Sequence, residues 1–408
     1  MYDRVPITYL DLENLKENTK QEICIFGAGK IGKTWGYDLI KAFGFQVNFY
    51  CDNKMPVGSV IRDNIKVVDI QYLYNNNKTL VFLAMDFKYQ QTVVRQFEEH
   101  KIYNFIIVDN VLLSEILESI ELSNNESVKL KYSTIYDDVE FLKRKFKYKV
   151  GYTLNIQSPK TFNEKMQWLK VYYHNPYYIK LVDKYAVKEY AEKKIGSEYI
   201  IPTIGVWSNF DEINFDSLPS EFVLKCTHDS GSVVIVDKNN QFDKNIIEEK
   251  LTRALKINYF WLGREWPYKH VKRRIIAEKY ISKPAEMIDY KFLCFNGQVK
   301  TIFTCTDRFS DSGLRVTFFN RKWERLPFER HYPASKELIE QPEHLQLMIE
   351  LSEKLSEEIP FVRVDFYEIK HRVYFGEMTF FPGGGMEEFM PQKWDDILGS
   401  WINLPQKI

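Results

Sequence analysis

Residues 361–385 read FVRVDFYEIKHRVYFGEMTFFPGGG, and this stretch gives the clearest indication of the fold of the C-terminal part of the chain. Its runs FVRVDFYEI and RVYFGEMTFF are rich in aromatic and β-branched residues and predict two strands. The first carries Arg363 and Asp365, and the second carries Glu377 and Thr379. Carboxylates on adjacent strands can hold Mg²⁺, which prefers hard oxygen ligands. An ordinary ion pair between Asp365 and Arg363 is the alternative, but Glu377 follows where a second ligand is expected, and we favour a metal site.

Two further features near these strands are candidates for substrate binding. Gly383 and Gly384 belong either to a plain turn or to a loop whose N–H groups face the reacting group, and their place just after Glu377 favours the second interpretation. Arg308 follows the predicted strand KTIFTCTD. It either binds a substrate carboxylate or forms a surface salt bridge, and the sequence favours neither.

Lysines upstream lie where phosphate binding is expected. Lys225 ends the apolar strand FVLKC, and the small-residue loop THDSGS follows it. A lysine and the N–H groups of such a loop can hold phosphate oxygens. His228, in this loop, is either a loop histidine or a contact of a lid. Lys184 lies near the start of the helix predicted in DKYAVKEYAEKKIG, and Lys291 lies in the later strand YKFLCFNG.

The N-terminal part reads EICIFGAGKIGKTWGYDLIKAFGFQVNFYCDN from Glu22, a strand, a Gly-rich turn, a helix and a second strand. The turn has the pattern GxGxxG, and the helix that follows presents free N–H groups to a phosphate. Later strands alternate with helical segments, which predicts a doubly wound α/β domain. The candidate nucleotide-binding residues are Gly27, Gly29, Lys30, Gly32 and the strand-ending Asp52, which could bind a ribose hydroxyl. A domain of this kind that binds nothing is the alternative.

Composition limits the remaining classes of function. The 408 residues include 56 Lys+Arg and 56 Asp+Glu, which argues against a polybasic nucleic-acid binder. The five cysteines are widely spaced without a CxxC pair, as in a reduced cytosolic protein. The N-terminus lacks a signal-peptide pattern, and no run of 18 apolar residues could span a bilayer. We therefore expect a cytoplasmic, multidomain protein of undetermined oligomeric state.

The order of the C-terminal motifs resembles the ATP-grasp fold. PKTFNEKMQWLK, DKYAVKEY, FVLKCTHDSG, DYKFLCFNG and GEMTFFPGGG are most similar to the TupA-like ATP-grasp branch, which is associated with teichuronopeptide and polysaccharide synthesis. The resemblance covers about residues 135–405. It implies two α+β lobes that grip ATP, over residues 151–408, with a lid subdomain at about 199–283. We expect a Rossmann-like domain over residues 1–115 and a helical connector over residues 116–150 before it.

The resemblance also implies roles for individual residues. Lys184 and Lys225 would contact the α/β-phosphates, and the loop of His228, Ser230, Gly231 and Ser232 would close over them. The hinge of Glu278, Lys279, Tyr280 and Ile281 would meet adenine. Either Glu286 or Asp289 would bind the ribose.

The catalytic residues follow from the same resemblance. Lys291 would reach the γ-phosphate, and Arg363 would stabilise an acyl phosphate. Asp365, Glu377 and Thr379 would hold one or two Mg²⁺ ions. Many ATP-grasp enzymes have Asn where this chain has Thr379, but the TupA-like branch shares the threonine.

The activity implied is ATP-dependent ligation of a carboxylate to an amine through an acyl phosphate. The N-terminal pattern resembles the Rossmann-like unit of sugar-modifying enzymes, including the nucleotide-sugar-binding domain of bacterial sugar acetyltransferases. Together these favour a sugar uronate or nucleotide-uronate joined to an amine or amino acid in capsular or surface polysaccharide synthesis. The alternatives are a glycosyltransferase-like polysaccharide enzyme and a non-catalytic nucleotide or sugar sensor.

Overall fold

The computed structural model describes residues 6–240, 242–283, 288–307 and 313–408. The chain divides into two compact units, residues 1–141 and residues 142–408. The first unit therefore includes most of the segment 116–150 that the sequence predicted as a helical connector, and the boundary lies within α8 (Asp138–Val150). Within the described residues, no helix is both long enough and apolar enough to cross a bilayer. All five cysteines are free thiols.

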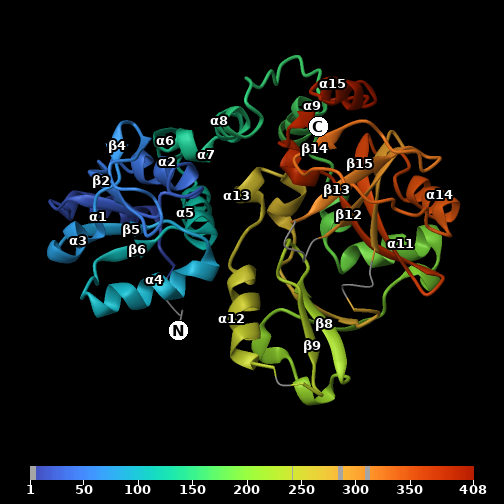
Figure 1. The fold of residues 1–408 in the computed structure, drawn as a ribbon, viewed down its shortest axis with the longest axis horizontal. Helices are drawn as coiled ribbons and strands as arrows, with labels where there is room; N and C mark the ends of the chain where they lie inside the picture. The colour runs from blue at the N-terminus through green and yellow to red at the C-terminus, as the bar shows by residue number, and fades with distance from the viewer. Residues whose placement is uncertain (1–5, 241, 284–287, 308–312) are drawn as a thin grey trace. The chain divides into compact units, whose positions relative to one another are not determined.

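The first unit is built on a parallel four-stranded sheet in the order β2-β1-β5-β6 (Figure 1). The two central strands, β1 (Ile23–Phe26) and β5 (Leu80–Leu83), are buried along their whole length. Strands buried on both faces must be covered by helices on both faces. On one face, Phe26 of β1 packs edge-on against Phe97 of α4 with ring centroids 5.0 Å apart.

The other elements of the first unit surround this sheet. The edge strands are β2 (Phe49–Cys51) and β6 (Phe105–Ile107), and a separate hairpin is formed by β3 (Val60–Arg62) and β4 (Ile65–Lys66). Its helices are α1 (Tyr9–Asn18), α2 (Trp35–Ala42), α3 (Ile70–Asn75), α4 (Phe87–Glu99), α5 (Asn110–Leu122), α6 (Glu126–Lys131) and α7 (Ser133–Tyr136).

The second unit contains two larger antiparallel sheets. The first has the order β7-β10-β8-β9, from β7 (Thr203–Trp207), β10 (Ile275–Lys279), β8 (Glu221–Cys226) and β9 (Val234–Asp237). These strands lie within the range 199–283 that the sequence predicted for the lid. Alternate residues, among them Phe222, Leu224 and Ala277, form a core with α12 (Lys244–Leu255), which lies along β8 and β9 in Figure 1. The opposite face of this sheet carries Lys225 and Glu278.

The second sheet has five strands in the order β13-β12-β11-β15-β16. They are β13 (Arg315–Phe319), β12 (Gln298–Thr306), β11 (Ile288–Phe295), β15 (Phe361–Ile369) and β16 (Arg372–Thr379). The helix α14 (Leu345–Leu355) packs on β11, β12 and β15. Because strand side chains alternate, the face away from α14 is the one left for a site. A short pair, β14 (Glu329–Arg330) and β17 (Phe389–Met390), lies beside this sheet.

The remaining helices of the second unit are α9 (Phe162–Tyr172), α10 (Tyr177–Val182), α11 (Ala186–Ile195), α13 (Phe260–Gly263) and α15 (Lys393–Ser400), with short 3₁₀ turns at Ser197–Tyr199, Phe210–Glu212, Phe215–Ser217, Trp266–His270 and Pro382–Gly385. A capping box starts α9: Thr161 accepts from the N–H of Glu164, and the Glu164 carboxylate accepts from the N–H of Thr161. This cap fixes the helix that lies against the glycine loop described below.

Candidate active site

A single row of side chains crosses the five-stranded sheet. Strand register pairs Phe318 with Phe303, Phe303 with Lys291, Lys291 with Asp365, and Asp365 with Glu377. Directly paired residues present their side chains on the same face, about 5 Å apart. The Lys291 Nζ lies 2.5 Å from the Asp365 Oδ2, which confirms this geometry at the centre of the row. The row brings together three residues that the sequence singled out from separate motifs.

Arg363 connects the two carboxylates of the row. Its Nε and Nη2 donate to both oxygens of Asp365 at 2.6 and 2.7 Å, and Nη2 also donates to the Glu377 Oε1 at 2.7 Å. Thr379, paired with Arg363 in register, donates its hydroxyl to the same oxygen at 2.8 Å. The ion pair between Arg363 and Asp365 is therefore present, and it belongs to a larger network that includes Glu377.

The charges of this network set the ionisation of its members. Burial by itself would raise the pKa of Glu377, but the positive charges of Arg363, Lys184 and Lys291 outweigh it and lower the pKa to about 2. Burial likewise lowers the pKa of Lys291, and the carboxylates of Asp365 and Asp289 reverse the effect, so that the net shift is upward. Both groups are thus charged at neutral pH.

The row offers oxygen ligands of the type that Mg²⁺ prefers. Asp365 and Glu377 offer carboxylate oxygens on adjacent strands, and Thr379 adds a hydroxyl. The two hydrogen bonds that Glu377 accepts both end on Oε1. A carboxylate has about four acceptor positions, so Oε2 retains capacity for a cation with respect to the described residues. Asp289, on β11, pairs with Lys291, and its Oδ1 is buried without a hydrogen-bond partner in the described structure.

The four-stranded sheet carries a second charged cluster. Glu278 on β10 lies between two lysines, 2.6 Å from Lys225 of β8 and 2.5 Å from Lys188 of α11. Its side chain is only 6% exposed. Burial would raise the pKa of Glu278, but the two ammonium groups lower it. Lys188 was missed at the sequence level, although it lies near the start of α11, shortly after Lys184.

Lys184 forms hydrogen bonds to the loop that follows Lys225. Its backbone N–H donates to the Thr227 carbonyl at 2.9 Å, and its Nζ bonds to the carbonyl of Asp229. Within the loop, Ser232 donates to Asp229 at 2.7 Å and accepts from the N–H of Cys226 at 2.8 Å, while Gly231 has φ +106°. Ser230 and Gly231 are exposed at its tip. The two lysines and the loop predicted to bind phosphates thus form one connected unit.

His228 of this loop points into the protein. The residue is 1% exposed, and its Nε2 lies 3.2 Å from the carbonyl oxygens of Ala254 and Ile257, at the end of α12. Burial lowers its pKa. Of the two interpretations that the sequence left open, this geometry favours a loop histidine that anchors the loop to α12.

The remaining predicted contacts of the nucleotide lie at the end of β10. Lys279 is the exposed last residue of the strand, and its N–H donates to the Pro202 carbonyl at 3.0 Å. Tyr280 and Ile281 follow it directly and are half-buried. Glu286 and Arg308 lie outside the described residues. The roles of these residues toward adenine, ribose and substrate stay predictions.

The glycine loop after β16 has an unusual backbone that a buried lysine and glutamine support. Gly383, Gly384 and Gly385 all have positive φ, at +62°, +66° and +59°, which residues with a Cβ rarely adopt. From α9, the Lys170 Nζ donates to the Gly384 carbonyl at 2.7 Å, and Gln167 donates to the Gly385 carbonyl at 2.7 Å. Burial lowers the pKa of Lys170 to about 8. Sequence analysis missed both residues, although they lie in the motif PKTFNEKMQWLK.

In the first unit, the glycine turn is closed by Asp52. Its Oδ2 accepts from the N–H of Ala28 at 2.8 Å, and its Oδ1 accepts from the N–H groups of Lys54 and Met55 at 2.8 and 2.9 Å. The carboxylate thus ties the turn to the end of β2. Gly27 has φ +105°, and Gly32 is so close to the Gly27 carbonyl that a Cβ would lie 1.9 Å from its oxygen. Gly29 and Lys30 are exposed on the turn. Packing therefore accounts for Gly27 and Gly32, and ligand binding by this turn stays a prediction.

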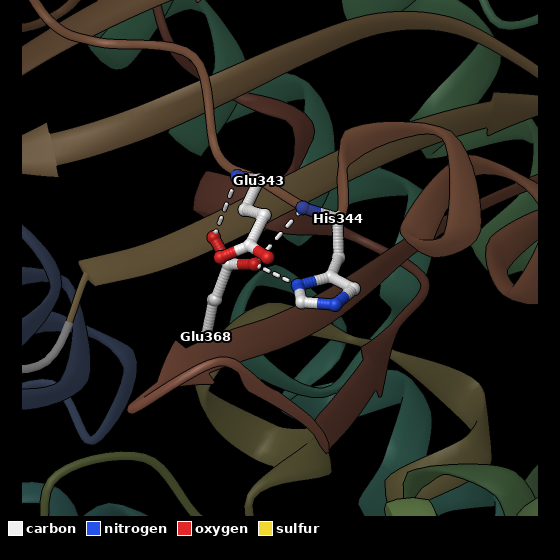
Figure 2. Close-up of side chains that lie close together, drawn as sticks. All are labelled: Glu343, His344 and Glu368. Atoms are coloured by element: carbon white, nitrogen blue, oxygen red, sulfur yellow. Dashed lines mark hydrogen bonds and ion pairs between the residues drawn. The ribbon is translucent and has the colours of Figure 1, made fainter.

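A separate cluster lies at the far end of β15 (Figure 2). His344, before α14, bonds through Nδ1 to Glu368, whose carboxylate also accepts from the N–H groups of Glu343 and His344 at 3.1 and 2.9 Å. These three side chains come close enough to share a metal ion. Glu343 is exposed and pairs instead with the exposed His371 at 2.5 Å. Ion pairs therefore account for this cluster without a metal.

Comparison with known proteins identifies a matching family model and similar solved structures. A family model described as TupA-like ATPgrasp matches residues 164–403. The chain is also similar to the solved structure of D-alanine–D-alanine ligase from Bacillus anthracis complexed with ATP, at 14% identity and a TM-score of 0.31, over 88% of this chain and 86% of that one. A RimK domain ATP-grasp protein from Sphaerobacter thermophilus matches at 13% identity and a TM-score of 0.30, over 54% of this chain and 65% of that one. No curated protein sequence matches the chain.

Proposed function

Because this chain belongs to the TupA-like ATP-grasp family, we propose that it is an ATP-dependent ligase that joins a carboxylate to an amine. The observation that carries the proposal is the row of Lys291, Asp365 and Glu377, bridged by Arg363, on one face of the five-stranded sheet. Such a row combines two hard-oxygen ligands with two fixed positive charges, which is what phosphoryl transfer from ATP needs.

The triphosphate of ATP would lie between the charged cluster around Glu278 on the four-stranded sheet and the row of Lys291, Asp365 and Glu377 on the five-stranded sheet. Lys184 and Lys225 supply positive charge on the side of the four-stranded sheet, and the loop tip at Ser230 and Gly231 offers exposed backbone N–H groups. Glu278 orients Lys225 by its contact at 2.6 Å. Lys291 would meet the γ-phosphate. Asp365, Glu377 and Thr379 would hold Mg²⁺, which neutralises phosphate charge when bound.

The proposed reaction has two chemical steps. A carboxylate oxygen of the acid attacks the γ-phosphorus, the bond to the β,γ-bridging oxygen breaks, and ADP leaves. The amine then attacks the carbonyl carbon of the acyl phosphate, loses a proton, and expels inorganic phosphate to leave an amide. In this proposal, the positive charges of Lys291 and Arg363 stabilise the negative charge that accumulates in both steps.

The substrates we propose are a sugar uronate or nucleotide-uronate and an amine or amino acid, in the synthesis of a capsular or other surface polysaccharide. The family's link to polysaccharide synthesis and the exposed Gly29 and Lys30 of the N-terminal turn support this proposal. In it, the first unit presents a nucleotide-linked sugar, whose phosphates would meet the start of α2.

The test is release of ADP and phosphate from Mg-ATP. Uronic acids and nucleotide-uronates are offered with amines and amino acids to the full-length protein. We expect release that depends on both an acid and an amine and is abolished in Lys225→Ala and Glu377→Ala. Lys193→Ala, which removes an exposed lysine of α11, is the matched control and retains activity. Tight ATP binding without turnover on any pair would contradict the ligase and favour a sensor.

A further inference from the structure

Arg330 lies at the end of the same row of side chains. Its guanidinium carbon is 5.4 Å from the centre of the Phe303 ring and 5.6 Å from that of Phe318. These rings are the two members of the row that follow Lys291 across the sheet. Strands are about 5 Å apart, so the guanidinium lies one to two strand spacings, about 5–10 Å, from Lys291 along the sheet. Arg330 is therefore on the face of the candidate active site.

Two nitrogens of the Arg330 guanidinium group make no hydrogen bond to the described residues. The residue is 6% exposed, yet its Nε and Nη1 are buried and have no hydrogen-bond partner in the described structure. Its Nε lies 2.9 Å from the Glu387 Oε2, an ion-pair contact whose angle does not make a hydrogen bond. Native proteins rarely leave buried donors unpaired, and a guanidinium matches the two oxygens of a carboxylate. The geometry indicates a ligand with an anionic, planar group.

Glu387 links Arg330 to the glycine loop. A Cβ built on Gly383 would lie 2.1 Å from the carboxyl carbon of Glu387, so this carboxylate rests directly on the Gly383 backbone. Gly383 follows β16, which carries Glu377. A positive and a negative side chain thus lie side by side between the row and the loop that comes after the metal-binding strand.

We propose that the amine substrate carries a carboxylate of its own, as an amino acid does, and that Arg330 binds this carboxylate. The inference rests on the proposed ligase function and specifies its acceptor. The paired charges of Arg330 and Glu387 complement the carboxylate and ammonium groups of an amino acid. An amino acid held there would lie about 5–10 Å from Lys291 along the row, on the face of the candidate active site. Arg330 is then a specificity residue for the acceptor.

The proposal is tested by comparing acceptors that differ only in the carboxylate. The full-length protein is assayed with Mg-ATP and the uronic acid panel, using glycine, alanine and glutamate, their α-amides, and hydroxylamine as amines. Hydroxylamine traps an acyl phosphate as a hydroxamate and has no carboxylate to bind. The variants are Arg330→Met, Arg330→Lys and the control Arg321→Met, which removes a guanidinium paired with Glu353 elsewhere in the unit.

We expect the wild-type protein to prefer an amino acid to its amide, and Arg330→Met to lose that preference. The ratio of amino-acid coupling to hydroxamate formation should fall about 10–100-fold in Arg330→Met through a rise in KM for the amino acid, because a hydrogen-bonded charge is lost. Arg330→Lys should recover part of the lost ratio, and Arg321→Met should keep the ratio of the wild type. An unchanged ratio in Arg330→Met would overturn the proposal while leaving the ligase intact.

A binding measurement separates this proposal from the function on which it rests. Calorimetric titration of the same amino acids into protein with Mg-ADP should give a Kd that rises at least tenfold in Arg330→Met. Absence of hydroxamate from every acid contradicts the ligase, whereas absence of amino-acid binding, or equal binding by the wild type and Arg330→Met, contradicts the acceptor site. Binding of inorganic phosphate at Arg330 in place of amino acids would also overturn it.

Discussion

Replacing Glu278 by glutamine should destabilise the second unit and make its stability depend on ATP. The carboxylate is 6% exposed and pairs with Lys188 at 2.5 Å and with Lys225 at 2.6 Å. Removing one partner of a buried ion pair costs about 3–5 kcal/mol, because it leaves charge buried without compensation. The lysine side chains are 13% and 17% exposed, so partial solvation places the cost near the lower end, at about 3 kcal/mol.

The assay is thermal unfolding of the full-length protein, followed by circular dichroism with and without Mg-ATP. For a unit of this size, about 2–4 °C of Tm per kcal/mol converts the cost into a fall of about 6–12 °C. Saturating Mg-ATP should raise the Tm of Glu278→Gln more than that of the wild type, because the phosphates replace the missing negative charge. Glu221→Gln, an exposed change on the same sheet, is the matched control and should shift the Tm little.

A double variant separates charge from packing. Adding Lys188→Met to Glu278→Gln removes one of the two unpaired ammonium groups, and it should restore about 0.5–3 kcal/mol of the stability lost, the usual range for residues in contact. A fall in Tm of less than 2 °C in Glu278→Gln would show that the buried ion pairs of Glu278 contribute little to stability and would refute this prediction. A large fall that Lys188→Met deepens instead of relieving would show that the loss comes from packing, and would refute the electrostatic reasoning.

Three further changes test other parts of the structure. Gly385→Ala should distort the glycine loop, because a Cβ at φ +59° would lie 2.3 Å from Met166 Cβ. We expect kcat to fall at least tenfold in the ADP-release assay. An unchanged kcat would show that the glycine loop takes no part in the reaction. Burial lowers the pKa of Lys170 from 10.5 to about 8 in the folded protein, so the unfolded state binds more protons between these pH values. The free energy of unfolding of the wild type should therefore rise from pH 8 to pH 10 relative to that of Lys170→Met, by at most about 1.4 kcal/mol per pH unit. A difference in urea-unfolding free energy between the two proteins that is the same at pH 8 and pH 10 would contradict this. Asp52→Ala removes the acceptor of three backbone N–H groups, and hydrogen exchange at residues 28, 54 and 55 should accelerate, whereas unchanged protection would mean that the turn holds without it.

Sequence reasoning identified Asp365 and Glu377 on adjacent strands, which a short turn joins. Their direct pairing depends also on a register shift between Asp365 and Phe366, which the spacing along the chain does not predict. Lys225 was singled out because a charged residue at the end of an apolar strand, next to a glycine loop, is unusual; the structure pairs it with Glu278, and its role toward ATP stays a prediction. The parallel sheet of the first unit likewise follows from alternating strands and helices.

The contacts that escaped prediction join segments far apart in the chain. Lys170 contacts the carbonyl of Gly384, and Arg330 contacts the rings of Phe303 and Phe318, through packing that no local pattern encodes. His228 and Asp52 show the opposite problem, because their sequence context is that of ligand-binding residues while their observed partners are backbone groups. A motif identifies candidates, and the hydrogen bonds that each candidate already makes show how much of its capacity remains for a ligand.

In the proposed reaction, a substrate carboxylate attacks the γ-phosphate of ATP on the face that carries Lys291, Asp365 and Glu377. The most direct measurement uses an acid that supports turnover, labelled with ¹⁸O in its carboxylate, and follows the released phosphate by ³¹P NMR. We expect one ¹⁸O atom from the carboxylate in each inorganic phosphate released, because that oxygen bridges carbon and phosphorus in the acyl phosphate. Phosphate free of ¹⁸O, released at the same rate as ADP, would contradict it.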